Sequence, residues 1–444
     1  MFYTLFLTII ITKKIVVTLN LATKGGAMEI KRDIYLDRLI EWKKNGLIKV
    51  VTGIRRCGKS YLLLNLFRRH LLESGVKEDH IIEVILDDLE NEELRDPYRM
   101  LKYVKGRIAD GETYYIIIDE VQLLARFEEV LNSLLHLPNA DIYVTGSNSR
   151  FLSSDVVTEF RGRGIELRVH PLSFREFSSV YRGSPDDAWN DYYVYGGLPL
   201  ITAMGSKREK VEYLDSLVQK VYLSDIIDRH KVRHRKELGD LVNVLASSIG
   251  SLTSFPKLAK TFKSVERKEI SPKTLANYTD YLADAFLISR AVRYDVKGRK
   301  YIGSPAKYYF EDVGLRNARL GFRQTEENHI MENILYNELK IRGYRVDIGV
   351  VDKFSKDKTD KTVKKRLEID FVASLGDEQY YIQSASDVAT AQKREQEERS
   401  LRAVNDGFKK IIVVKENIGL RRDNSGIVTI GIRKFLLDGL SLLR

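Results

Sequence analysis

The sequence predicts an α/β protein whose first large unit is a parallel sheet with helices on both faces. Two observations support this fold class. Five nearly continuous apolar runs of strand length lie between residues 47 and 169, and helix-like segments separate them. Strands of a parallel sheet have that composition because they are buried on both faces. Alternating strands and helices are typical of such a sheet.

The strands of this first unit are expected in order along residues 28–170. The apolar runs are 47–51, 80–86, 113–119, 141–146 and 164–169. Two helical segments between them are "KSYLLLNLFRRHLLESG" at 59–75 and "RFEEVLNSLLHLP" at 126–138. Residues 28–170 are therefore predicted to form one domain.

Three further regions follow this domain. Residues 171–235 are predicted to be a helical lid or linker, with the turn "YGGLP" at 195–199. Residues 236–321 are predicted to form three helices and a hairpin that turns at Gly298, with Ser271 as N-cap and Pro272 in the first turn of the third helix. Residues 322–444 mix helix and strand and contain a lysine-rich stretch at 352–366, expected to be a solvated loop.

The composition is that of a soluble globular protein with several domains. Its 444 residues suit two to four domains, and 43% are hydrophobic and 30% charged. The single cysteine excludes an intrachain disulfide framework and fits a reducing compartment, here the cytoplasm. A formal net charge of +11 favours a polyanionic partner, although a basic balance is more often only a solvated surface.

Residues 1–27 are expected to be an extension outside the fold. Their first apolar run is too short to span a bilayer, and Lys13 and Lys14 follow it instead of preceding it as in a signal peptide. Met28 is the expected natural first residue, with a disordered tail or a weak membrane-surface anchor as alternatives. No later segment resembles a transmembrane helix, so no stable membrane insertion is expected.

A phosphate-binding loop is predicted at residues 53–60, "GIRRCGKS", which fit the pattern G-x-x-x-x-G-K-[ST] between a strand and a helix. Glycines allow successive backbone amides to face a phosphate, and the helix N-terminus adds partial positive charge. Lys59 would reach the β and γ phosphates of ATP, and Ser60 would bind Mg²⁺. The residues expected to bind nucleotide are Gly53, Ile54, Arg55, Arg56, Cys57, Gly58, Lys59, Ser60, Tyr61 and Ser147.

Two adjacent carboxylates end the third apolar run, in "YYIIIDE". Asp119 is expected to hold Mg²⁺, and Glu120 to polarise the attacking water as the catalytic base. The next run ends in "TGSNS", where Thr145, Ser147 or Asn148 could contact the γ phosphate; a simple Gly-Ser turn is the equal alternative. Arg161 and Arg163 precede the fifth run. Arg163 is the candidate catalytic arginine that a homo-oligomer would present across a subunit interface, although solvated arginines are commoner.

Several segments taken in order resemble a known family. "GIRRCGKS", "IIIDEVQ", "YVTGSNS", "GRGIELRVHPLSFREF" and "YGGLP" are together similar to prokaryotic AAA-type ATPases with a C-terminal domain of unknown function, the AAA_14/DUF4143 group. The resemblance covers nearly everything after Met28. It implies a P-loop NTPase core, then a winged-helix region at 236–321, then a degenerate nuclease-like domain of the PD-(D/E)XK type at 322–444. On that pattern Lys59, Glu120 and Arg163 are catalytic, and Ser60 and Asp119 serve the metal.

The third helix of the winged-helix region is a candidate DNA reader. Leu275, Tyr278, Leu282 and Phe286 share one apolar face, while Lys273, Thr274 and Asn277 lie off that face near its start. Arg293, Lys297, Arg299 and Lys300 would contact phosphates from the hairpin. The alternative is a winged helix used for protein contact or for packing between subunits.

The last region resembles a restriction-endonuclease-like core that has lost catalytic groups. Glu332 would lie on a helix and Asp370 on a strand, but the pair expected on the next strand is Gln383 and Ala385. Metal-dependent cleavage needs carboxylates and a lysine beside the water. Lys393 is the candidate replacement. The preferred interpretation is that the nuclease-like fold is retained as a scaffold and has no cleavage activity.

These patterns predict an ATP-hydrolysing, Mg²⁺-dependent nucleotide switch that acts on DNA or a DNA-bound partner. One alternative is a DNA nuclease gated by ATP. Another is an interaction protein in which the nucleotide is structural and is never hydrolysed.

Overall fold

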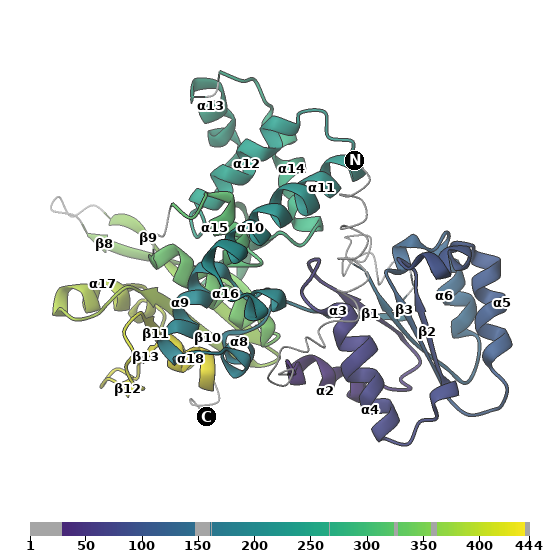
Figure 1. Ribbon diagram of the computed structural model, residues 1–444. Coiled ribbons are helices and arrows are strands. Elements are labelled where there is room, and N and C mark those ends of the chain that lie inside the picture. The colour runs from purple at the N-terminus through teal and green to yellow at the C-terminus, as the bar shows by residue number, and fades with distance from the viewer. Residues whose placement is uncertain are drawn as a thin grey trace.

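A computed structural model describes residues 29–146, 160, 162–265, 267–323, 327–356 and 362–439. Residues 1–27, Ser147, Asn148 and Arg161 lie outside the described residues. The described chain contains two sheets, one of five strands and one of eight, with a group of helices between them in sequence (Figure 1).

The five-stranded sheet is parallel throughout and has the order β2-β3-β4-β1-β5. Its strands are β1 (Ile48–Thr52), β2 (Ile81–Ile85), β3 (Tyr114–Asp119), β4 (Ala140–Thr145) and β5 (Gly164–Arg168). Every residue of β1 and β3 is buried. All five predicted strands are therefore confirmed, and so is the parallel sheet.

Helices cover both faces of this sheet. They are α2 (Asp33–Glu41), α3 (Lys59–Tyr61), α4 (Arg68–Glu73), α5 (Pro97–Arg107) and α6 (Phe127–Leu135). A π-helical segment, Leu62–Phe67, joins α3 to α4 in one continuous helix. Side chains of α5 and α6 pack against Ile116 and Ile118 on one face, whereas α2 and the α3–α4 helix pack against Tyr115 and Ile117 on the other. The alternation of neighbouring residues between faces follows from the strand period of two.

A helical region follows the first sheet. Its helices are α8 (Phe174–Val180), α9 (Pro185–Tyr195), α10 (Lys207–Ser216), α11 (Ser224–Arg229), α12 (Arg235–Ser247), α13 (Phe255–Val265), α14 (Pro272–Asp284) and α15 (Val313–Arg319). A π-helical segment, Leu217–Leu223, connects α10 to α11. Ser271 caps α14 by accepting from the amide of Thr274, and Pro272 occupies the first turn, as the sequence predicted.

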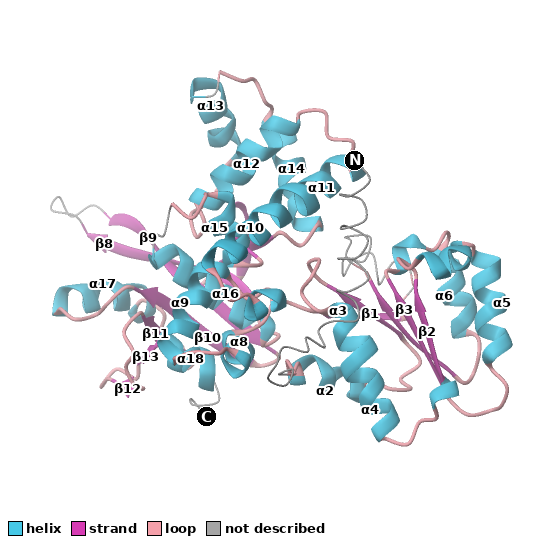
Figure 2. Ribbon diagram, in the orientation of Figure 1, coloured by secondary structure: helices cyan, strands magenta, loops and turns pink. Residues whose placement is uncertain are grey.

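The eight-stranded sheet has the order β12-β13-β11-β10-β9-β8-β6-β7. Its strands are β6 (Ile288–Asp295), β7 (Lys300–Phe310), β8 (Arg345–Lys356), β9 (Thr362–Leu375), β10 (Glu378–Ala385), β11 (Lys409–Val414), β12 (Arg421–Arg422) and β13 (Val428–Gly431). The helices of this part are α16 (Glu327–Ile341), α17 (Ala391–Arg402) and α18 (Ile432–Asp438) (Figure 2).

The predicted hairpin is not a free wing. β6 pairs with β7 and also, in parallel, with β8, so the hairpin forms one end of the eight-stranded sheet. The boundary predicted between residues 321 and 322 therefore separates strands that share one sheet. The winged helix was implied by the family resemblance and by the local pattern of three helices and a hairpin, and neither shows that the hairpin pairs with a distant strand.

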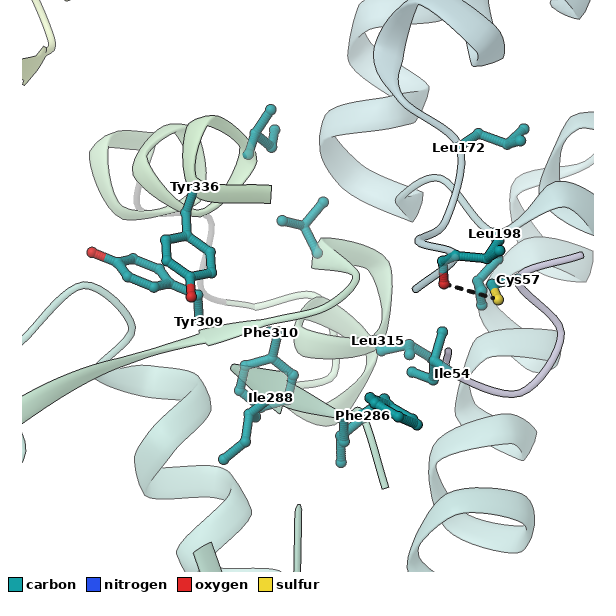
Figure 3. Packing of buried hydrophobic residues seen from close by; sticks show 14 of the residues in the cluster. Ile54, Cys57, Leu172, Leu198, Phe286, Ile288, Tyr309, Phe310, Leu315 and Tyr336 are labelled. Atoms are coloured by element: carbon teal, nitrogen blue, oxygen red, sulfur yellow. Dashed lines mark hydrogen bonds between the residues drawn. The ribbon is translucent and has the colours of Figure 1, made fainter. Parts of the chain in front are cut away.

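The two halves of the chain share one hydrophobic cluster. Its buried members include Ile54 and Cys57 of the phosphate loop, Leu198 of the lid region, and Leu315 and Tyr336 of the C-terminal half (Figure 3). Burial of apolar surface across this contact stabilises the arrangement of the two halves. Within the described ranges, no helix has the length and apolar character needed to cross a membrane.

Candidate functional site

The phosphate loop, residues 53–60, follows β1 and depends on its two glycines. Gly53 has φ +138°, and a Cβ at this position would lie 2.1 Å from the carbonyl oxygen of Val169. Gly58 has φ +102° and precedes Lys59, the first residue of α3. Both conformations are unfavourable for any residue with a side chain. The sequence pattern thus reflects steric needs at these two positions.

The Lys59 side chain folds back over this loop. Its Nζ donates to the carbonyl oxygens of Gly53 (3.1 Å) and Ile54 (3.3 Å), and the side chain is buried. The first amides of a helix have no intrahelical acceptor, so the start of α3 presents donors near the Lys59 ammonium. This arrangement suits a phosphate group.

Ser60, Asp119 and Thr145 come together at the carboxyl ends of the strands. The Ser60 hydroxyl donates to Asp119 Oδ1 (2.9 Å), and the Thr145 hydroxyl donates to the same oxygen. Burial raises the pKa of Asp119 to about 6, although the hydrogen bonds from Thr145 and Ser60 lower it. A buried carboxylate in this position gains from a nearby cation.

Glu120 follows Asp119 in a left-handed conformation, with φ 53° and ψ 49°. Its amide donates to the Thr145 hydroxyl (2.9 Å), and its carboxylate accepts from the Gln122 side-chain amide. The backbone turn and these two contacts fix the direction of the carboxylate. Such strain at a non-glycine residue is frequent at functional sites.

These residues fit Mg²⁺ and a triphosphate. Mg²⁺ commonly binds one or two protein carboxylates together with substrate phosphates. Asp119 and the Ser60 hydroxyl would therefore be sufficient as the protein ligands of the metal. In the described part of the chain, no group of three or more His, Cys, Asp or Glu side chains is arranged to hold a metal by itself. Lys59 and the loop amides would hold the phosphates.

Other predicted nucleotide-binding residues turn their side chains elsewhere. Ile54 and Cys57 are completely buried in the hydrophobic cluster, so only their backbone faces the loop. The Cys57 thiol donates to the carbonyl oxygen of Val169 (3.3 Å), and burial raises its pKa. Tyr61 is half-buried with its hydroxyl near the backbone of Ile30, and burial raises its pKa. Ser147 lies outside the described residues.

The two arginines of the loop differ in environment. Arg55 forms an ion pair with Asp225 of α11 (3.3 Å), and its carbonyl oxygen accepts from the Tyr222 hydroxyl (2.9 Å). Arg56 is exposed and has φ 64°. The helical segment 217–229 therefore contacts the phosphate loop directly.

Arg163 lies at the opposite end of the sheet from the phosphate loop. Its carbonyl oxygen accepts from the amide of Ile48, the first residue of β1, whereas the loop follows the last residue of β1. Its exposed side chain therefore cannot act on a nucleotide held by the same chain. A role for Arg163 requires a second copy, which remains a prediction.

Sequence reasoning missed several residues that support the loop. The buried Arg32 donates to the carbonyl oxygens of Cys57 (3.3 Å) and His170 (2.6 Å) and pairs with Glu176 (3.1 Å). The second such residue is Tyr222, whose hydroxyl donates to the carbonyl oxygen of Arg55. No local pattern identifies either residue as a support of the loop, because their partners are distant in sequence.

The region that the sequence predicted to be nuclease-like contains an acidic cluster around a lysine, Lys307, which the sequence did not single out. Lys307 of β7 is buried among three carboxylates, with Nζ 2.9 Å from Glu332, 2.8 Å from Glu368 and 3.8 Å from Asp370. Burial alone would lower its pKa, but the carboxylates outweigh that effect and raise it. Burial and the neighbouring Glu332 raise the pKa of Asp370, whereas the Lys307 ammonium lowers it. The ammonium thus lies at the centre of this acidic cluster.

Lys393, the predicted replacement lysine, is not part of this cluster. It pairs with Asp387 (2.7 Å) and is exposed. Gln383 accepts weakly from the amide of Asp370 (3.4 Å), and Ala385 is buried. Glu332 lies on a helix, α16, and Asp370 on a strand, β9, as predicted, whereas the candidate Lys393 lies outside their cluster. The pairing of β7, which brings Lys307 into the cluster, was not visible in the sequence.

Comparisons with known proteins agree with the geometry of the first unit. A family model described as an AAA domain, AAA_14, matches residues 45–178, and one described as a domain of unknown function, DUF8612, matches residues 186–326. A protein of Haemophilus influenzae is 32% identical over 390 residues, which cover 86% of this chain and 93% of that protein. The chain belongs to the family of that protein, and its first unit is an AAA domain. The domain named by the sequence resemblance, DUF4143, is thus replaced by DUF8612 for residues 186–326.

More distant proteins are also similar to this AAA protein. A protein of Methanocaldococcus jannaschii is 27% identical over 418 residues, 90% of this chain and 86% of that protein. Among solved structures, the Walker-type ATPase of Pyrococcus abyssi has a TM-score of 0.46 at 16% identity, over 66% of this chain and 96% of that one. The ORC1 protein of Aeropyrum pernix in complex with DNA has a TM-score of 0.32 at 13% identity, over 68% and 95%. Both TM-scores are below 0.5, so neither of these structures supports an argument about the site.

Proposed function

We propose that this AAA protein binds ATP with Mg²⁺ and hydrolyses it, and that the nucleotide state changes how the C-terminal half contacts DNA or a DNA-bound partner. The contact of Ser60 and Thr145 with one buried oxygen of Asp119 carries the proposal. It brings the ends of β3 and β4 to the start of α3, where Lys59 lies. The single buried thiol is consistent with the cytoplasm as its compartment.

Each residue has a defined task in this proposal. Lys59 would exchange its bonds to the carbonyls of Gly53 and Ile54 for phosphate oxygens. Ser60 and Asp119 would hold Mg²⁺, which neutralises charge on the phosphates. Glu120, fixed by Thr145 and Gln122, would accept a proton from the attacking water. The Arg163 side chain would need a neighbouring copy to contribute.

Two substitutions test the ATPase. Lys59→Ala should abolish ATP binding or turnover, because it removes the ammonium next to the loop. Glu120→Gln should still bind Mg·ATP, but its turnover should fall by about 100-fold or more. Lys102→Ala on the exposed face of α5 is the matched control and should behave as wild type. Calorimetric binding and phosphate release measure the two steps; normal turnover in Lys59→Ala would end the proposal.

DNA contact is supported by the start of α14. Leu275, Tyr278 and Leu282 are buried, whereas Lys273 and Asn277 are exposed. Arg293, which the sequence assigned to phosphate contact, is instead buried and donates to the carbonyl oxygens of Ser304 (2.7 Å) and Pro305 (3.0 Å). Lys273→Glu should therefore weaken DNA binding without changing ATP affinity, as a titration of labelled duplex at several salt concentrations would show.

A nuclease gated by ATP is the less favoured alternative. The Lys307 ammonium fills the carboxylate cluster in which a metal would have to bind. Plasmid incubated with Mg²⁺ or Mn²⁺ and ATP should therefore stay intact. Nicking that disappears in Asp370→Ala would favour the nuclease instead.

A further inference from the structure

The lysine-rich stretch that the sequence placed in a solvated loop is largely a two-stranded ribbon. We call residues 352–356 of β8 and 362–366 of β9 the arm. Their antiparallel register pairs Asp352 with Arg366 and Lys353 with Lys365. Figure 1 shows the labelled ends of β8 and β9 together at the margin of the molecule, above α17. A paired ribbon is a defined surface, because its side chains alternate between two faces.

The arm carries five cations and one carboxylate. Asp352 pairs with Lys364 (2.7 Å) and Arg366 (3.3 Å) on one face of the ribbon. Lys353 and Lys365 are exposed on the other face, directly opposite each other. Positive charge is therefore present on both faces.

The opposition of Lys353 and Lys365 is unfavourable by itself. Like charges directly across an antiparallel pair destabilise a sheet, typically by a few tenths of a kcal/mol to about 1 kcal/mol. Val363, 44% exposed, lies on the same strand as Lys365. A polyanion beside this face would remove the repulsion, so the pairing indicates a binding surface.

The neighbouring hairpin extends the positive surface. The Lys297 ammonium, near the β6–β7 turn, donates to the carbonyl oxygen of Asp352 (3.4 Å), which brings the two hairpins together. Arg299 and Lys300 of the same turn are exposed. The turn and the arm therefore form one continuous basic surface at the same end of strands β6 to β9.

We propose that the arm binds double-stranded DNA by seating in the major groove. That groove, about 12 Å wide, admits a two-stranded β-ribbon. A ribbon inside it has a phosphate wall on each side, and the cations on both faces of the arm match this arrangement. An anionic membrane surface or a flat acidic protein would need the charge on one face only. The inference rests on DNA being the partner in the proposed function, but it names a surface separate from α14.

The test compares two variants with the same change in net charge. Lys353→Glu with Lys365→Glu keeps a like-charged pair in the arm, so folding should be little affected. Lys102→Glu with Lys105→Glu changes exposed residues of α5, at the other end of the molecule (Figure 1). Binding of a fluorescent 20-base-pair duplex would be measured by anisotropy over a range of salt concentrations, with melting curves of each variant.

The arm variant should bind duplex at least ten-fold more weakly at low salt, with the salt slope reduced by about 2, because two phosphate contacts are lost. The α5 variant should match wild type. Lys353→Gln with Lys365→Gln should give an intermediate loss, which excludes a folding effect of the acidic pair. Duplex RNA should bind more weakly than DNA, because its major groove is too narrow for side chains.

Other outcomes would overturn the inference. Undiminished duplex binding by the arm variant, with loss in Lys273→Glu, would reject the arm and leave the proposed function intact. Absence of duplex binding by wild type would reject both the arm and the DNA partner, while ATP hydrolysis would still be measured separately. If the wild-type protein bound phosphatidylserine vesicles but not DNA, the arm would be a membrane-binding surface, and the proposal that it binds the major groove of DNA would be rejected.

Discussion

At the scale of single residues, the ammonium of Lys307 neutralises an acidic cluster in the C-terminal half. Glu332, Glu368 and Asp370 are arranged around it, and the Tyr309 hydroxyl also donates to Glu332 (2.6 Å). An ammonium held by three carboxylates needs no metal. The same acids without the ammonium would repel one another, and a divalent cation could then replace it.

Lys307→Met should lower the free energy of unfolding by about 3 kcal/mol, because it leaves buried carboxylates without their cation. Mn²⁺ should raise the melting temperature of this variant and restore part of that loss. The double variant Lys307→Met with Asp370→Asn is the control and should show a much smaller rise. Thermal melts with and without Mn²⁺ measure the effect. A Mn²⁺-dependent rise in wild type that Asp370→Asn removes would show that the metal binds with the lysine in place.

At the scale of elements, the segment 217–229 connects the helical region to the phosphate loop. Tyr222, buried in the π-helical stretch, donates to the carbonyl oxygen of Arg55, and Asp225 of α11 pairs with the Arg55 side chain. A π-helical stretch is often found at functional sites. A change in the loop on nucleotide binding would therefore be transmitted first to this segment.

Tyr222→Phe should weaken ATP binding about five-fold, since it removes one hydrogen bond worth about 1 kcal/mol while keeping the ring in the core. The melting temperature should fall only slightly. Tyr103→Phe on α5, whose ring lies under Arg107, is the matched control. Calorimetric titration with Mg·ATP gives the affinities. Equal affinities for wild type and Tyr222→Phe would mean that this contact does not shape the loop.

At the scale of the whole molecule, Glu311 joins the two halves. It follows β7 in the C-terminal half and accepts from Arg168 of β5 (2.8 Å), while its other oxygen lies against His170 Nδ1. Burial alone would raise the pKa of Glu311, but Arg168 and His170 outweigh it and lower the pKa to about 2. Burial lowers the pKa of His170, although Glu311 raises it, and the Arg168 guanidinium supplies a countercharge to Glu311.

This link predicts a pH-dependent difference between wild type and Glu311→Gln. A lowered carboxyl pKa stabilises the folded state above the ordinary value of 4.5, and that contribution is lost as the pH falls towards 2. Glu311→Gln should therefore cost about 3 kcal/mol near pH 7 and progressively less below about pH 4.5. Urea denaturation at several pH values measures the difference. A constant difference from pH 7 to pH 3 would show that the pair is not ionised as described.

The first domain and its loop could be predicted because their signals are local. Continuous apolar runs identify strands buried on both faces, and Gly53 and Gly58 are required by backbone angles within a few residues of Lys59 and Ser60. Asp119 and Glu120 could be placed since parallel strands end at the same edge as the loop. The sequence alone therefore determined the parallel sheet, the phosphate loop and the carboxylate pair beside it.

Tertiary structure alone decided the rest. Arg163 lies at the far end of the sheet, Arg293 is buried, Lys307 enters the acidic cluster, and the basic loop is a ribbon. In each case the partner is distant in the chain, and the direction of the side chain depends on strand order and register. One sequence does not encode these pairings in any local pattern, because they arise only when separate segments pack together.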